Sequence, residues 1–105
     1  KDVKLCYNDY NEYMGHKTQG ILNIVKAIQD ASNDEELPTR IDVIGMQSHM
    51  GSNFPNPTSY EVALKKFIAT GLDIHVTELD LGDFINADDV TQANLYASYF
   101  SIFVK

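Results

Sequence analysis

The stretch HVTELDLG, residues 75–82, begins like a buried β-strand and then places two carboxylates where another apolar residue would be expected. Side chains alternate across a strand, so Glu78 and Asp80 are predicted to share one face. The same face would carry Ile74 and Val76. If it belongs to the core, the two charges enter a dry environment, which is costly unless they are paired or used. The stretch therefore predicts a strand that ends in functional groups, with a simple exposed strand end as the alternative.

Three strand-like runs organise the chain, at residues 3–11 (VKLCYNDYN), 40–49 (RIDVIGMQSH) and 72–80 (LDIHVTELD). A helical pattern follows each run, which predicts a βαβαβα order, a parallel sheet and right-handed crossovers. Three such units fit either a doubly wound sheet or part of a (β/α)₈ barrel. No glycine-rich phosphate loop follows a strand, which disfavours the nucleotide-binding folds.

The predicted helices are defined by apolar spacing and by capping residues. The first has the stripe Ile21, Ile24, Val25 and Ile28 and is expected to end near Asn33. The second has a capping-box spacing at Thr58 and Glu61, a C-terminal Gly71, and the face Tyr60, Ala63, Leu64, Phe67 and Ile68. The third is expected to start near Asn86 or Asp88 and to run through Val90, Ala93, Ala97 and Phe100 to the end of the chain.

Composition narrows the possible partners. The chain has 105 residues, is 44% hydrophobic and carries a formal net charge of −7, as one globular domain of ordinary size can. This acidic balance argues against nucleic acid and anionic membranes as partners and is compatible with a neutral ligand such as a sugar. Cys6 is the only cysteine and is predicted to be a small buried residue, so neither a disulfide framework nor a zinc site is expected.

Polar residues recur at the carboxyl end of each predicted strand, on one alternation class. The pairs are Asn8 with Tyr10, Gln47 with His49, and Glu78 with Asp80. This recurrence favours a barrel, whose interior is apolar below and whose active site lies at the carboxyl ends of the strands. His75 has the other parity and is predicted to lie between strand and helix. His16 is predicted to lie in a loop or at a helix start.

The motifs YNDYN (7–11), IDVIGMQSH (41–49) and HVTELD (75–80) resemble glycoside hydrolase family 10, the endo-β-1,4-xylanases. The resemblance implies a (β/α)₈ barrel in which these runs are the fifth, sixth and seventh strands. It also implies a retaining xylanase with xylan or xylo-oligosaccharides as substrate, no cofactor or metal, and secretion from the cell. Two alternatives remain: a non-catalytic xylan-binding or scaffold fragment, and a related barrel β-glycanase such as a cellulase.

Residue roles follow from the matching motif positions. Glu78 matches the catalytic nucleophile, His49 the histidine that hydrogen-bonds it, and Asp80 the carboxylate that supports this histidine. The substrate-binding positions implied by the resemblance are Asn8, Tyr10, Asn11 and Gln47.

One catalytic group of the family has no counterpart in this sequence. The family's acid/base glutamate follows an asparagine on the fourth strand, upstream of Lys1, and the Asn11–Glu12 pair belongs to the YNDYN motif instead. The chain also contains no tryptophan, although the family's last strand carries one. Residues 1–105 are therefore expected to be a three-eighths section of a single catalytic domain, inactive without the remaining barrel segments.

Overall fold

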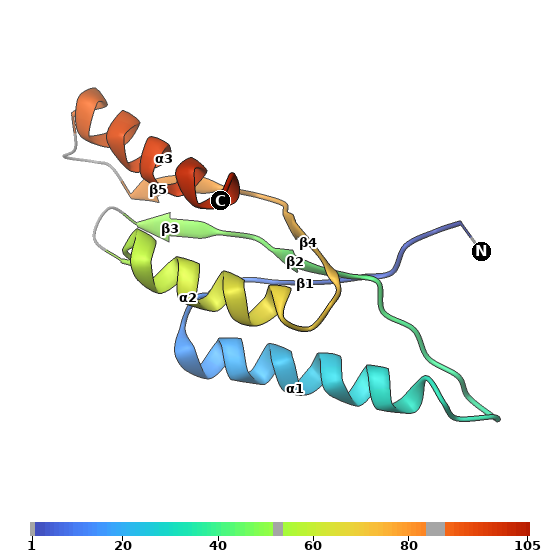
Figure 1. The fold of residues 1–105 in the computed structure, drawn as a ribbon. Helices are drawn as coiled ribbons and strands as arrows, with labels where there is room; N and C mark the ends of the chain where they lie inside the picture. The colour runs from blue at the N-terminus through green and yellow to red at the C-terminus, as the bar shows by residue number, and fades with distance from the viewer. Residues whose placement is uncertain (1, 52–53, 84–87) are drawn as a thin grey trace.

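The computed structural model describes residues 2–51, 54–83 and 88–105. Strands and helices alternate along the chain as predicted, with two of the predicted strands each divided into two (Figure 1). The elements are β1 (Cys6–Asp9), α1 (Gly15–Ala31), β2 (Val43–Met46), β3 (His49–Gly51), α2 (Pro57–Ile68), β4 (Asp73–Val76), β5 (Asp80–Asp83) and α3 (Asp89–Phe103).

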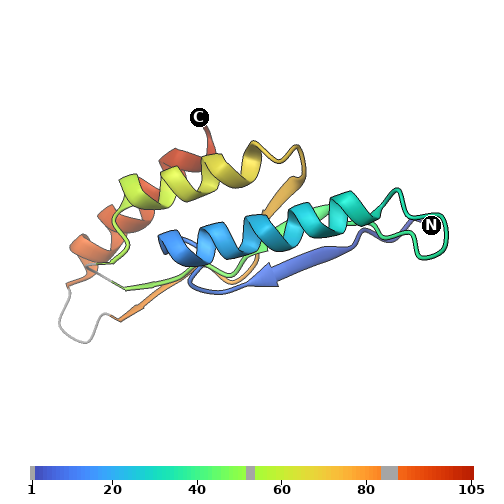
Figure 2. The same ribbon diagram turned by 90° about the horizontal axis from the view of Figure 1, so that it is seen from below.

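All strand pairing among these elements is parallel. β1, β2 and β4 form one sheet in that order, and β3 pairs with β5 in a second, two-stranded sheet. Helices α1 and α2 lie on the same side of the strands, and α3 lies beside α2 next to β3 and β5 (Figures 1 and 2). The strand register places Gly45 beside both Asn8 and His75, so these three residues share the face away from the helices.

The other face of the sheet holds the core. Ile44 and Met46 on β2 are fully buried and belong to one apolar cluster with residues of all three helices. Its other fully or almost fully buried members include Ile21, Val25, Tyr60, Phe67, Leu81 and Tyr99. Burial of each large apolar side chain contributes about 1.5–3 kcal/mol. The helix-facing side of the sheet therefore carries the stability of the described segment.

The predicted face of the third strand is wrong. Ile74 and Val76 pair with Ile44 and Met46 and so lie on the helix side, whereas His75 is exposed on the opposite face. The reason is that β4 ends at Val76, and a bend at Glu78 separates it from β5. Strict alternation therefore does not continue from Ile74 to Glu78, and His75 does not lie between strand and helix.

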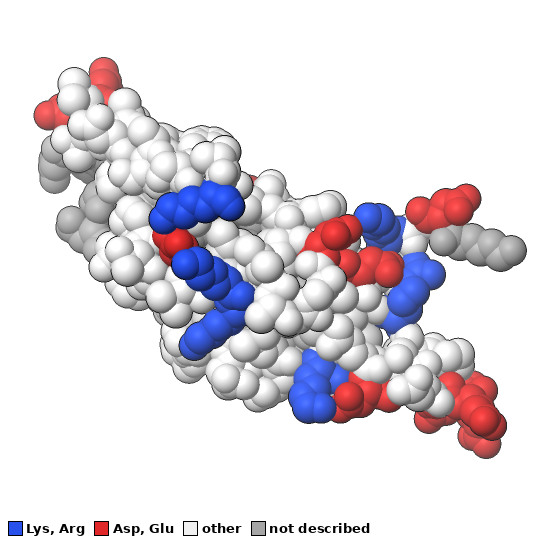
Figure 3. Space-filling view, viewed as in Figure 1, with Lys and Arg blue, Asp and Glu red and all other residues white. Residues whose placement is uncertain are grey.

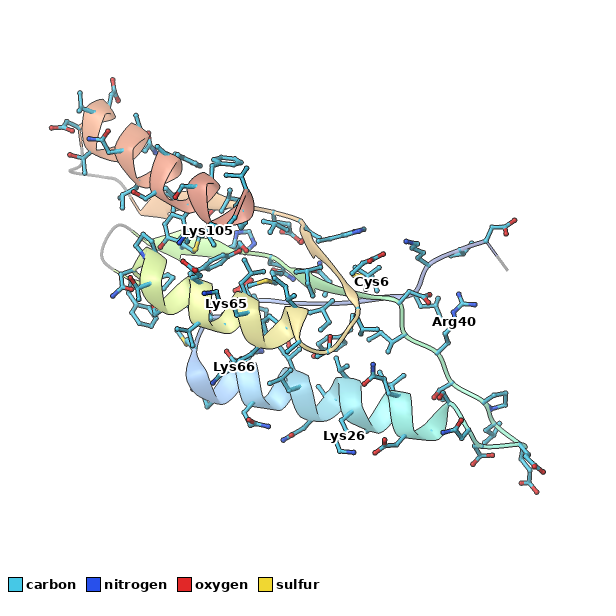
Figure 4. The ribbon with its side chains drawn as sticks, viewed as in Figure 1. Cys6, Lys26, Arg40, Lys65, Lys66 and Lys105 are labelled. Atoms are coloured by element: carbon cyan, nitrogen blue, oxygen red, sulfur yellow. The ribbon has the colours of Figure 1, made fainter. Side chains whose placement is uncertain are left out.

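Two helix predictions also need correction. Asn56, not Thr58, caps α2: its side chain accepts the N–H of Ser59 at 2.8 Å, and Pro57 occupies the first turn. Glu61 instead pairs with Lys65 and Lys105, each at 3.0 Å. Figure 4 labels the two lysines on α2 and just after α3, and Figure 3 shows basic side chains close to an acidic one over these helices. Gly71 has the left-handed φ of +85° expected of a helix-ending glycine, in the turn after α2.

Helix α3 begins as predicted but buries another face. Asp88 caps it by accepting the N–H of Thr91 at 2.7 Å, whereas Asn86 lies outside the described residues. Val90 and Phe100 of the predicted face are exposed, and Tyr99 and Ile102 are buried instead. Because α3 is apolar on most sides, spacing alone does not select the face that the larger side chains fill.

Burial also differs from prediction at a few single residues. Cys6 is exposed on the open face, because no helix covers that side of β1. Ile21 and Val25 of α1 are buried as predicted, whereas Ile24 of the same stripe is 40% exposed. His16 lies in the first turn of α1, as predicted. Within the described ranges, no helix has the length and apolar character needed to cross a membrane.

Candidate active site

Three of the predicted site residues meet where β3 and β5 begin. The His49 Nδ1 atom lies 2.8 Å from a carboxylate oxygen of Asp80, and its Nε2 atom lies 3.1 Å from a carboxylate oxygen of Glu78. The β3–β5 pairing places His49 directly opposite Asp80. Within this segment all three side chains are 42–50% exposed.

The two contacts determine the charge that His49 favours. A carboxylate only accepts hydrogen bonds, so both ring nitrogens must donate if both contacts are hydrogen bonds. The hydrogen bond to Asp80, and to a smaller extent that to Glu78, raises the pKa of His49 above its ordinary value. The two contacts therefore stabilise the charged form of the imidazole relative to the neutral form, and the contact with Asp80 orients the ring.

Backbone bonds hold the two carboxylates in place. The Glu78 N–H donates to the carbonyl of Gln47 at 3.2 Å, and the Asp80 N–H donates to the carbonyl of Ser48 at 3.1 Å. These bonds continue the strand pairing through the bend at Glu78. The bend turns the Glu78 side chain toward His49. The alternation of one continuous strand predicted the same orientation.

Asn8 lies on the same open face beside Gly45. Its Oδ1 accepts a hydrogen bond at 3.0 Å from the hydroxyl of Thr77, the residue that precedes Glu78 in the chain. A Cβ at position 45 would lie 2.6 Å from this Oδ1 and 2.9 Å from the Cys6 sulfur. Gly45 is thus required for the close approach of these side chains.

Tyr10 follows β1 and is 55% exposed. The Lys17 ammonium lies 4.5 Å from the centre of its ring, a cation–π contact. Lys17 also binds Asp9 at 2.9 Å, and Asp9 accepts the Tyr7 hydroxyl and the Tyr10 N–H, each at 2.7 Å. These bonds hold the pKa of Asp9 below its ordinary value despite its partial burial, which opposes them. The Tyr10 ring is therefore held in place, open to solvent.

Gln47 and Asn11 have mainly backbone roles among the described residues. Gln47 is half-buried; its N–H donates to the carbonyl of Asp9, and its own carbonyl accepts from Glu78. Asn11 has a left-handed φ of +53° and forms a turn in which its carbonyl accepts the Met14 N–H. Within the described ranges, no side-chain hydrogen bond joins Gln47, Asn11 or Tyr10 to the His49 group.

Sequence reasoning missed the acid closest to this backbone. Glu12 is fully buried, and one of its carboxylate oxygens accepts the N–H of Ser48 at 2.5 Å. Tyr13, next to it, donates its hydroxyl to the carbonyl of His49 at 2.8 Å. The only signal in the sequence is that Glu12 directly follows the YNDYN motif at residues 7–11, and the sequence pattern assigns it to that motif without a role of its own.

A parallel sheet with helices on one face and polar side chains at its carboxyl ends defines the class of (β/α)₈-barrel proteins, of which this chain forms a part. The chain belongs to glycosyl hydrolase family 10, whose family model matches residues 1–105. Both the predicted family and the predicted fold class are thus confirmed.

The curated relatives include proteins named as a xylanase and as an exoglucanase. The chain is 42% identical over 99 residues to the bifunctional endo-1,4-beta-xylanase XylA of Ruminococcus flavefaciens, covering 94% of this chain and 9% of that protein. It is 37% identical to exoglucanase XynX of Acetivibrio thermocellus, covering 96% of this chain and 9% of that protein. The chain therefore spans about a tenth of the length of these two relatives.

Solved structures agree with the sequence comparison. A family 10 xylanase of Thermobacillus composti superposes with a TM-score of 0.83 at 32% identity, over 97% of this chain and 35% of that chain. A xylanase10C mutant of Cellvibrio japonicus in complex with xylopentaose superposes with a TM-score of 0.81 at 29% identity, over 97% and 22%. The segment thus corresponds to about a quarter to a third of these enzymes.

Proposed function

We propose that the protein containing these residues is a retaining endo-1,4-β-xylanase with Glu78 as its nucleophile. The observation that carries the proposal is the contact of one histidine with two carboxylates, Glu78 at 3.1 Å and Asp80 at 2.8 Å, at the carboxyl end of a barrel sheet. The family membership of the chain supports the same assignment.

The proposed reaction proceeds in two displacements. Glu78 attacks the anomeric carbon, forming an ester to the sugar while the glycosidic oxygen leaves with a proton from an acid. Water then attacks the same carbon, gives its proton to that group, now a base, and releases Glu78. His49 donates a hydrogen bond to Glu78, which keeps the carboxylate oriented for attack.

We propose that the acid/base carboxyl lies outside these 105 residues. A retaining pair of carboxyls is separated by about 5–5.5 Å, and one of them must be free to exchange a proton with the leaving oxygen. Asp80 is already engaged by His49. The segment alone is therefore expected to lack turnover and to act only with the remaining barrel segments.

The proposed substrate is β-1,4-xylan and its oligosaccharides. The xylanase names of the relatives and the xylopentaose complex of the Cellvibrio japonicus enzyme support it. Asn8, Gln47 and the fixed Tyr10 ring are proposed to contact the sugars, since rings and amides at the mouth of a barrel suit hydroxyl-rich ligands. Because a polysaccharide does not cross membranes, we propose that the protein acts outside the cell.

A mechanism-based label tests the nucleophile. The full-length protein is treated with a 2-fluoro-xyloside inactivator, digested and mapped by mass spectrometry. The expected result is one labelled peptide, carrying the adduct on Glu78, with no label in Glu78→Gln and full labelling of Glu35→Gln, whose exposed side chain lies far along the chain. Labelling of another carboxylate in the native protein would exclude Glu78 as the nucleophile.

The exoglucanase name of one relative favours a second candidate, cleavage of β-1,4-glucan. Chromatography of the products from xylan and from cellulose at equal enzyme concentration separates the two. Xylo-oligosaccharides as the dominant products support the proposed substrate, whereas release of cello-oligosaccharides at an equal or higher rate supports the second candidate. Isothermal titration of Glu78→Gln with xylohexaose separates a xylanase from a scaffold without affinity for the sugar.

A further inference from the structure

Glu12 is the one fully buried acid among the described residues, and the proposed reaction does not use it. One of its carboxylate oxygens accepts the Ser48 N–H, but the other has no hydrogen-bond partner within the described part of the chain. Burial raises the pKa of Glu12, and the bond from Ser48 only partly opposes this rise. A buried, half-satisfied carboxyl destabilises a protein, so its presence calls for a role in the backbone that it contacts.

Ser48 is the point at which the second strand changes direction. Its φ of +61° is left-handed, a conformation that a residue with a Cβ rarely adopts without outside support. Its N–H donates to Glu12, its carbonyl accepts from Asp80, and its hydroxyl lies 2.7 Å from the Tyr60 hydroxyl. Each polar group of this buried residue thus has a partner, and these partners keep the left-handed bend in place.

The bend determines where the next residue points. His49 leaves Ser48 with its ring between Glu78 and Asp80, and its carbonyl accepts the Tyr13 hydroxyl at 2.8 Å. Glu12 and Tyr13 are neighbours in the turn that follows β1. A single turn therefore holds the peptide N–H of Ser48 and the carbonyl of His49.

The turn itself is anchored to α1. The Thr18 hydroxyl, on a buried side chain, lies 2.6 Å from the carbonyl of Glu12 and 3.0 Å from that of Met14. The carboxylate of Glu12 is thus carried by a fixed backbone, so that it can transmit its position to Ser48. An acid on a mobile backbone could not hold Ser48 in one conformation.

We propose that Glu12 is a positioning residue for the proposed active site: its carboxyl fixes the left-handed backbone of Ser48 and thereby the orientation of His49. Glu12 touches no sugar and acts only through Ser48. The proposal rests on the proposed function, since it concerns the same His49 group. It adds a residue from the preceding βα unit to the machinery that orients the nucleophile.

Three variants of the full-length protein test the proposal by steady-state kinetics. Glu12→Ala removes the acceptor for Ser48, and kcat per active site is expected to fall about 10–100-fold with KM changed less than about twofold, because misplacement of a catalytic group by about 1 Å has an effect of this size. Glu12→Gln keeps an acceptor oxygen and is expected to remain within about threefold of the native kcat. Glu35→Ala, at an exposed position, is the matched control and is expected to be unchanged.

Nuclear magnetic resonance of His49 separates positioning from mere stability. The charged side chains that face its ring are Glu78 and Asp80, and Glu12 lies behind its backbone. In ¹⁵N-histidine-labelled Glu12→Ala, the imidazole pKa is expected to fall toward its ordinary value as the ring leaves its partners, and in Glu12→Gln it is expected to stay raised. A purely structural role would lower Tm and the number of active sites, counted with the inactivator, but not kcat per site or this pKa.

The outcomes are decisive in each case. Native kcat per site and a native His49 pKa in folded Glu12→Ala would overturn the proposal. If Glu12→Ala does not fold, Glu12→Leu, which fills the space without an acceptor for the Ser48 N–H, gives the same two measurements. Full activity of Glu78→Gln would instead overturn the proposed function, whatever the Glu12 variants show.

Discussion

The two faces of the central sheet differ in almost every property. Toward α1 and α2, β2 presents Ile44 and Met46, both fully buried. On the other face lie Cys6, Asn8 and His75, all exposed, beside a glycine. Residues on the helix side of a strand therefore contribute to stability, and residues on the other side form the candidate site. Substitutions on the first side should change the unfolding free energy, and substitutions on the second should change kcat or KM.

The largest effect is expected on the helix side. Phe67 of α2 is fully buried, and Phe67→Ala should lower the free energy of unfolding by about 3–5 kcal/mol through lost burial and a cavity. Denaturant unfolding of the full-length protein measures this, with kcat per active site unchanged. Leu37→Ala, in the loop after α1 and 77% exposed, is the control and should cost less than about 1 kcal/mol. Equal losses for both would mean that the core does not lie where the structure places it.

The next effect is expected at the carboxyl ends. Asp80→Asn should lower kcat about 100-fold, equivalent to about 2.7 kcal/mol, because His49 loses the carboxylate that orients it. The raised pKa of His49 means that its imidazolium contributes stability at low pH, and this contribution is lost as pH rises through the raised pKa. In Asp80→Asn the imidazole pKa should fall and this contribution should shrink, as a nuclear magnetic resonance titration would show.

Asp73→Asn provides the contrast for that variant. Asp73 lies at the opposite end of β4, where it pairs with Lys4 at 2.8 Å in an exposed ion pair. Exposed pairs contribute little, so kcat and the His49 pKa should not change. A comparable loss of activity in Asp73→Asn would contradict the assignment of chemistry to one end of the strands.

A smaller effect is expected at Gly45, where side chains of β1 pack closely against the backbone of β2. Gly45→Ala places a Cβ 2.6 Å from Asn8 Oδ1, so Asn8 must move away from Thr77. We expect a loss of about 1–2 kcal/mol in unfolding free energy and a raised KM. Gly20→Ala in α1 meets nothing within 4 Å and should stabilise the protein slightly, since alanine favours helices. Thermal melts and kinetics of both variants check the opposite signs.

The smallest effect concerns Glu12, the buried acid in the turn after β1. A carboxyl whose folded pKa is raised destabilises the protein once it ionises, so its cost is absent at low pH and appears as pH rises through the folded pKa. Glu12→Gln removes that cost and should raise Tm by about 2 °C at neutral pH and by less in acid. Melting curves across pH check this, and a constant difference at every pH would contradict the raised pKa.

Alternation and helix spacing predicted the framework and half of the site correctly. Asn8 and Gly45 share the face away from the core, as the strand period predicts, whereas the direction of His49 depends on the left-handed bend at Ser48. Asp88 was one of two positions expected near the start of the third helix, because acids suit the first turn of a helix, and it is the residue that caps α3. The roles of Glu78, His49 and Asp80 came from the resemblance to family 10, because hydrophobic periodicity carries no information about catalytic roles.

The bends were not predictable from local sequence. A left-handed Ser48 is disfavoured in isolation and exists because Glu12, Asp80 and Tyr60 hold it. The meeting of Glu78 with His49 was expected for a wrong reason, since Ile74 and Glu78 do not share a face. The bend at Ser48 and the contact of Glu78 with His49 both depend on residues 12 or more positions away in the chain. The alternation of side chains along a single strand contains no information about such partners.

The bond between the Ser48 and Tyr60 hydroxyls has a consequence for thermal behaviour. Tyr60 belongs to α2, so the helix layer is tied directly to the residue that precedes His49. Loosening of α2 from the sheet should therefore release the Ser48 hydroxyl and disturb the position of the next residue, His49. We therefore expect the upper working temperature of the protein to be set by the docking of this one helix rather than by melting of the barrel as a whole.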